Sequence, residues 1–111
     1  MKTIDLEFED YPGIYTVTVS PVPMAAFESA WALHLAGVRL YQETGDLAGL
    51  RATIAEFGKV AQPKWNGKSA KLLDLDPNLV IEIVRQWHAG VRSVPLPLLR
   101  RSGSTASSLA E

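Results

Sequence analysis

The feature that most constrains the fold is a change of hydrophobic period at two prolines, Pro21 and Pro23. Before them, residues 3–8 alternate between apolar and acidic side chains, and residues 14–19 are rich in β-branched and aromatic side chains. Both patterns are typical of strands. After Pro23, apolar residues recur every three or four positions, as in helices. Since proline cannot donate to a strand ladder, we predict an α+β chain, predominantly α, that begins with a β-hairpin over 3–20.

The remaining elements follow from turn and cap signals. The sequence Asp10-Tyr11-Pro12-Gly13 is a turn signal and is predicted to link the two strands. Asp46 can cap a second helix, and Asp76-Pro77 combines a cap with a proline in the first helical turn. Three helices are therefore predicted, over residues 24–43, 46–60 and 77–92.

The segments outside these helices differ in composition. Residues 63–71 show neither period and are predicted to form a loop. Residues 100–111 are rich in Ser, Gly and Ala and are expected to form a flexible tail that buries too little to order itself. We therefore expect one globular domain over 1–99, which agrees with a length of 111 residues.

Composition excludes several classes of protein. With 47% hydrophobic and 21% charged residues, the chain has the composition of an ordinary globular protein. The absence of cysteine excludes disulfides, thiolate metal sites and cysteine nucleophiles. The N-terminus carries acids where a secretory signal needs basic residues, and no apolar run is long enough to span a membrane. We therefore expect a cytoplasmic location and no membrane contact.

No motif for chemistry stands out. The acidic residues of the first strand could bind a cation, but their alternation with apolar residues is explained by a solvated strand face: Asp5, Glu7, Glu9 and Asp10. His34 and His88 lie on different predicted helices with no ligand-type residue three or four positions away. No glycine-rich phosphate loop is present. We expect no enzymatic activity, catalytic residue, metal or cofactor.

Two features point to binding instead. Lys64, Trp65, Lys68 and Lys71 combine an aromatic residue with cations, the minimal set for a single-stranded nucleic-acid surface, although a lone tryptophan more often covers the core beneath it. The helix 24–43 is apolar or small around most of its circumference, so it is either central to the fold or shared with a partner. A stripe along it is expected at a self-association or partner interface, with Trp65 as a further contact: Ala26, Ala30, Leu33, Gly37 and Leu40.

The order of motifs along the chain supports a more specific hypothesis. An acidic strand is followed by Tyr11-Pro12-Gly13, a second strand, a helical middle and Lys64-Trp65-Asn66. Residues 73–80 read LDLDPNLV, then IVRQW follows at 83–87 and GVRSVPLPL at 90–98, before the serine-rich end. In this pattern the sequence resembles the tail assembly chaperones of long-tailed bacteriophages of the siphophage type.

The resemblance implies a non-enzymatic function in virion assembly. Members of that family bind the long, apolar, helical tape measure protein in the host cytoplasm, keep it soluble while tail tube protein is recruited, and are absent from the finished virion. The implied partners are the tape measure protein, the tail tube protein and further copies of the chain. The alternative is a small phage-encoded adaptor that binds nucleic acid or protein through the Lys64–Lys71 segment, although the modest net charge of −1 argues against nucleic acid.

Overall fold

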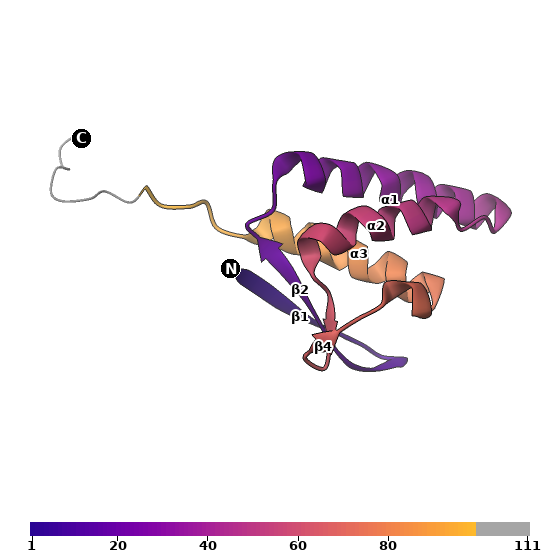
Figure 1. Ribbon diagram of the computed structural model, residues 1–111, viewed down its shortest axis with the longest axis horizontal. Coiled ribbons are helices and arrows are strands. Elements are labelled where there is room, and N and C mark those ends of the chain that lie inside the picture. The colour runs from indigo at the N-terminus through magenta and orange to yellow at the C-terminus, as the bar shows by residue number, and fades with distance from the viewer. Residues whose placement is uncertain (100–111) are drawn as a thin grey trace, which may run out of the picture.

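The computed structural model describes residues 1–99 and confirms an α+β fold with an N-terminal hairpin and three helices (Figure 1). The predicted helices 24–43, 46–60 and 77–92 match the observed ones within two residues at each end. The predicted tail, 100–111, lies outside the described residues. The observed elements are β1 (Lys2–Phe8), β2 (Tyr11–Ser20), α1 (Met24–Thr44), α2 (Ala48–Ala61), β3 (Lys64–Trp65), β4 (Lys68–Ser69), the 3₁₀ turn η1 (Leu72–Asp74) and α3 (Pro77–Ser93).

The strands form one antiparallel sheet in the order β1-β2-β3-β4. β2 is the longest strand, and its Tyr15, Val17 and Val19 are buried on one face, as the period-two pattern predicts. The predicted turn at Asp10–Gly13 is wrong, because Tyr11 already pairs with Phe8 and the chain reverses at residues 9–10.

The prediction that residues 63–71 form a loop is also wrong, because β3 and β4 make a second, short hairpin. Its turn is Asn66-Gly67, with φ angles of 50° and 84°. Two consecutive positive φ angles are what a type I′ turn requires, and Asn-Gly is the preferred sequence. The Ile14 N–H donates to the Asn66 Oδ1 atom at 2.9 Å, and the Asn66 N–H donates to the Ile14 carbonyl at 2.8 Å. These two bonds attach the small hairpin to β2.

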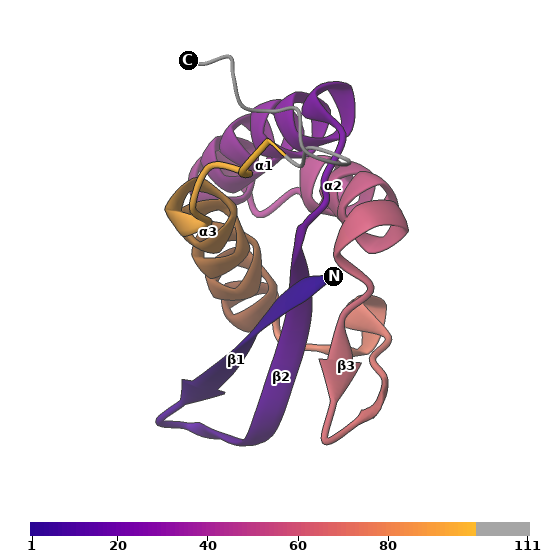
Figure 2. The same ribbon diagram turned by 90° about the vertical axis from the view of Figure 1, so that its left-hand side faces the viewer.

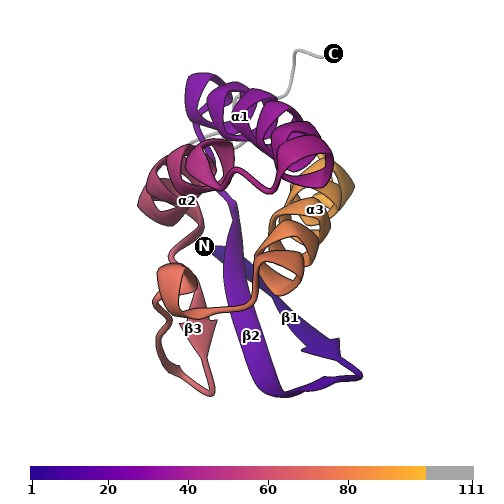
Figure 3. The ribbon, with the colours of Figure 1, turned by 90° about the vertical axis from the view of Figure 1, so that its right-hand side faces the viewer.

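All three helices lie on one side of the sheet, as Figures 2 and 3 show from opposite ends of the molecule. α2 and α3 contact β2, whereas α1 lies over these two helices and forms the outer layer. The buried core joins the sheet to the two inner helices. Its largest fully buried side chains are Trp87, Phe57, Ile83, Val17 and Val84.

Trp87 is the centre of this core. It has no exposed surface, and its Nε1–H donates to the Thr18 carbonyl of β2 at 2.9 Å. Its ring lies 5.2 Å from that of Phe57 on α2, in an edge-to-face arrangement, and 5.6 Å from that of Phe27 on α1. One side chain therefore connects α3 to the sheet and to both other helices.

Most of the apolar surface of α1 is covered by α2 and α3 of the same chain. On one side, Gly37 lies against Gly49 of α2, so closely that a Cβ atom on Gly37 would be 2.6 Å from the Gly49 carbonyl carbon. On the other side, Phe27 and Trp31 stack on His88 of α3, with ring centroids 4.8 and 3.7 Å apart. The expectation that the small-residue stripe is spare surface is therefore wrong for Ala30 and Gly37, which α1 buries inside its own fold.

Candidate functional site

A groove runs beside α2, between that helix and the segment 63–77. It consists of two adjoining hollows of about 630 and about 80 Å³, and Ile54, Leu72 and Leu73 line both. We call this surface the α2 groove. Residues of α2 and of the β3–β4 hairpin line opposite sides of the wide hollow, and Figure 1 shows α2 above this hairpin. The wide hollow also has polar residues in its lining, whereas the narrow hollow is mostly apolar, with Leu47, Leu50, Leu75, Pro77 and Val80 in its wall.

Local structure places the leucines of the groove. Phe57 and Ala61 of α2 are buried in the core, which leaves Ile54, on the adjacent side of the helix, only partly covered. In η1, Leu72 points inward and is 3% exposed, whereas Leu73 is 66% exposed. Gly58, in the wall of the wide hollow, has no atom within 4 Å of the place where a Cβ would be. The groove therefore has an apolar floor that the described chain leaves open.

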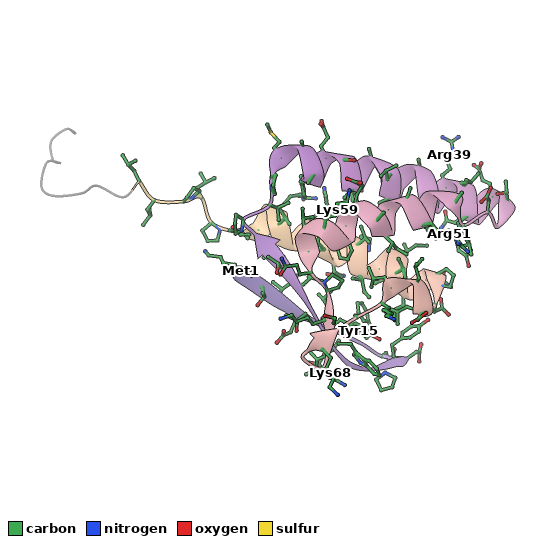
Figure 4. The ribbon with its side chains drawn as sticks, viewed as in Figure 1. Met1, Tyr15, Arg39, Arg51, Lys59 and Lys68 are labelled. Carbon is green, nitrogen blue, oxygen red and sulfur yellow. The ribbon has the colours of Figure 1, made fainter. Side chains whose placement is uncertain are left out.

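The rim of the α2 groove is basic. Arg51, Lys64 and Lys71 line it, with Asp74 as the one carboxylate among its lining residues. None of these four makes an ion pair with another residue in 1–99. Figure 4 shows Arg51 on α2 near the α1–α2 turn, and Lys68 at the outer end of the small hairpin. An acidic or uncharged apolar segment suits this rim better than a basic one.

Trp65 lies next to the groove on β3 and is 47% exposed. Its ring stacks on Tyr15 at a centroid distance of 6.3 Å, and its Nε1–H donates to the Pro12 carbonyl at 3.3 Å. Gly13 lies under the indole, where any Cβ would clash with it. One face of the Trp65 indole therefore packs against the sheet, so less of the ring is free to stack on a nucleic-acid base.

The other residues of the predicted self-association site do not gather into an open surface. Ala26, Leu33 and Leu40 are partly buried, and Ala30 and Gly37 are buried. The outer face of α1 is instead lined by other apolar residues, among them Met24 and Leu35, which are 83% and 54% exposed. The structure therefore separates Trp65 from the α1 stripe rather than joining them in one site.

Both histidines belong to an aromatic stack between α1 and α3. His34 is 3% exposed and stacks on Trp31 at 4.8 Å, and its Nδ1 atom is buried with no hydrogen-bond partner in the described chain. Burial lowers the pKa of His34, and the charges of His88 and Arg85 lower it further. Burial, with Arg92 nearby, also lowers the pKa of His88. Both rings are therefore neutral packing elements at neutral pH.

Comparisons of the chain with models of known protein families, with curated proteins and with solved structures give no match. Within residues 1–99, no three His, Asp or Glu side chains are grouped so as to hold a metal ion. No helix in the same part of the chain combines the length and apolar character that a membrane crossing requires.

Sequence reasoning missed the groove. Leu72 and Leu73 belong to no periodic segment, and Leu73 entered the sequence analysis only as the first residue of the 73–80 motif, not as part of a binding surface. The Asn66-Gly67 dipeptide was the available signal, because a hairpin there turns the chain back toward α2 and forms the second wall.

Proposed function

We propose that the protein is a phage tail assembly chaperone that binds the tape measure protein through the α2 groove, keeps it soluble and helps to recruit tail tube protein. The observation that carries the proposal is the open apolar floor of the groove, with Leu73 exposed above it. Grooves of this kind bind the apolar face of an amphipathic helix through leucine-type anchors. The motif order that resembles the family supports the same client.

The nature of the groove also supports a role in assembly. A chaperone must release its client, so each subunit needs only modest affinity. Several copies bound along one elongated client raise the overall affinity. The α2 groove is shallow and partly polar, which agrees with weak binding per copy. The proposal includes no catalysis and no cofactor, and it places the protein in the cytoplasm of the host and outside the finished virion.

The test is co-expression with a tape measure protein from a long-tailed phage. Wild type should increase the soluble fraction of the client, and Leu73→Asp should abolish the increase, because the leucine contact is lost and a carboxylate must give up its hydration to enter an apolar contact. The matched control is Leu35→Asp, which puts the same charge on the outer face of α1, 54% exposed and away from the groove. Both variants should melt like wild type.

A synthetic helical peptide with leucines at positions i, i+3, i+4 and i+7 gives the affinity directly. Leu73→Asp should weaken binding by about 1.4 kcal/mol or more, a factor of ten, whereas Leu35→Asp should bind like wild type. A client that is equally soluble without the protein, or two variants that behave alike, would overturn the proposal.

The adaptor alternative has its own signature. If Lys64 and Lys68 bound phosphates, affinity for a single-stranded oligonucleotide would fall steeply with salt, because counterions are released. Apolar docking in the α2 groove depends only weakly on salt. Fluorescence anisotropy at two salt concentrations, with the peptide and with the oligonucleotide, separates the two functions.

A further inference from the structure

The α2 groove has the length of a helix. Its lining on the α2 side begins just before the helix, ends just after it, and recurs every three or four positions: Leu47, Leu50, Arg51, Ile54, Gly58 and Gln62. From the first to the last of these residues a helix advances about 22 Å, or about four turns. An amphipathic helix is the kind of partner that contacts such a groove along its whole length. The groove is therefore long enough for a docked helix of about 15 residues.

Cations lie toward both ends of the groove. Arg51 lines the narrow hollow, whereas Lys64 and Lys71 line the wide hollow, which reaches the end of α2. All three are exposed, and none forms an ion pair within residues 1–99. Asp74 is the one carboxylate in the lining within the same residues, so the rim keeps a net positive charge. The apolar floor, with Leu73 exposed above it, lies between these charges.

The positive charge of the rim is local, because the whole chain has a formal net charge of −1. Each exposed ion pair at such a rim adds little affinity. Like charges nevertheless disfavour a wrong partner, and complementary charges guide the right partner into register. The rim is therefore suited to selecting among helices that share the same leucine stripe.

We propose that the α2 groove selects amphipathic helices whose leucine stripe has an acidic residue at each end. The inference rests on the proposed function, since it specifies which client helices the groove accepts. One client carboxylate would face Arg51, and the other would face Lys64 and Lys71. From Arg51 to Gln62 a helix advances about 16–17 Å, which a docked helix covers in about 11 residues, or about three turns. Two acidic residues about 11 positions apart therefore lie on the same face as the leucines between them.

Nucleic acid is the other anionic partner that a basic rim attracts, but the groove favours a helix. Single strands bind where bases stack on aromatic side chains. Among residues 1–99, the lining of both hollows is aliphatic or polar and includes no aromatic ring. Trp65 lies beside the groove, and one face of its indole packs against the sheet. The cations of the rim thus flank a floor that matches leucines rather than bases.

Three stapled helical peptides test the selection. They share leucines at positions i, i+3, i+4 and i+7 and carry Glu, Gln or Lys at both ends of this stripe, with the staple on the opposite face to keep all three helical. At about 0.1 M salt the Glu peptide should bind about tenfold more tightly than the Lys peptide, with the Gln peptide between them. The difference should shrink at 1 M salt, where the screening length falls from about 10 Å to about 3 Å. The affinity of the uncharged Gln peptide should change little.

Charge reversal places the selection at the rim. The double variant Lys64→Glu, Lys71→Glu should prefer the Lys peptide. The matched control, Lys2→Glu with Lys68→Glu, makes the same change in net charge at exposed residues outside the groove lining, with Lys68 at the outer end of the small hairpin (Figure 4). It should keep the preference of wild type. Asp74→Asn removes the opposing carboxylate and should tighten binding of the Glu peptide about twofold or more. Circular dichroism checks that each variant is folded.

Several outcomes would overturn the inference. Equal affinities for the three peptides, or the same behaviour of the two double variants, would show that the rim selects nothing. Displacement of the Glu peptide by a single-stranded oligonucleotide at equal concentration would make the rim a phosphate-binding surface. A fall in peptide affinity as the protein concentration rises would make a second copy the occupant of the groove.

The same measurements distinguish this inference from the proposed function. If the three peptides bind equally and Leu73→Asp abolishes binding, the groove still binds leucine helices and only the acidic selection is lost. If the Glu peptide is preferred but the tape measure protein is no more soluble with the protein than without it, the selection stands and the chaperone proposal is removed. If no peptide binds, both are overturned.

Discussion

Trp87→Phe is the substitution whose cost can be worked out most directly from the structure. The phenylalanine ring keeps the aromatic contacts with Phe27 and Phe57. The change removes the Nε1–H that the Thr18 carbonyl accepts at 2.9 Å in a buried position. A buried acceptor left without its donor costs about 1–3 kcal/mol, and the space left by the smaller ring adds about 1 kcal/mol.

The expected loss is therefore about 2–4 kcal/mol out of a total stability of about 5–15 kcal/mol. In a domain of this size each kcal/mol lowers Tm by about 4–8 °C, so the variant should melt roughly 10–25 °C below wild type. Urea unfolding followed by circular dichroism gives the free energy of unfolding, and thermal melting gives Tm. The larger truncation, Trp87→Ala, should cost about 3–5 kcal/mol from packing alone.

Trp65→Phe is the matched control, since it makes the same chemical change in a ring that is 47% exposed. Its bond to the Pro12 carbonyl is longer, at 3.3 Å, and lies where water can replace it. The cost should stay near 0.5 kcal/mol, roughly the limit for surface changes. If Trp87→Phe melted like wild type, or if both variants lost the same stability, Trp87 would not be the centre of the core.

Two other stability predictions accompany the binding experiments above. Gly37→Ala should lower the free energy of unfolding by about 1–3 kcal/mol, because its Cβ would meet the Gly49 backbone. Gly58→Ala should raise it by about 0.5–1 kcal/mol, because a Cβ there would point into open space. Equal urea midpoints for the two variants would refute the close α1–α2 contact. Because burial lowers the pKa of His34, the unfolded chain binds a proton that the folded chain does not once the pH falls below about 6.5. Stability should fall as the pH drops from there, less steeply in His34→Phe, and an unchanged slope would contradict this account. Part of the remaining slope comes from His88, whose pKa burial also lowers, and, at lower pH, from Glu82, whose pKa is lowered by its hydrogen bond from Arg85.

Sequence alone determined the elements whose signals are local. The alternation in 3–8 and 14–19 placed the first hairpin, and the Asp76 carboxylate caps α3 as expected, accepting from the Asn78 N–H at 2.7 Å. The Asn66-Gly67 signal was present in the same way, but strands of two residues are too short to show a period. Local chemistry is sufficient in these cases because caps and turns are made by residues close together in the chain.

Only the tertiary structure decided what covers each apolar face. The period of helix 24–43 showed that two sides of it are apolar, but not that Gly49 covers one side and His88 the other. Likewise, the Trp87 indole N–H donates a hydrogen bond to a carbonyl 69 positions away in the sequence. Ile54 and Leu73, which the small hairpin separates in the sequence, line the same groove. Periodicity reports that a face is buried, whereas the partner depends on how the helices pack over the sheet, which involves contacts between distant residues.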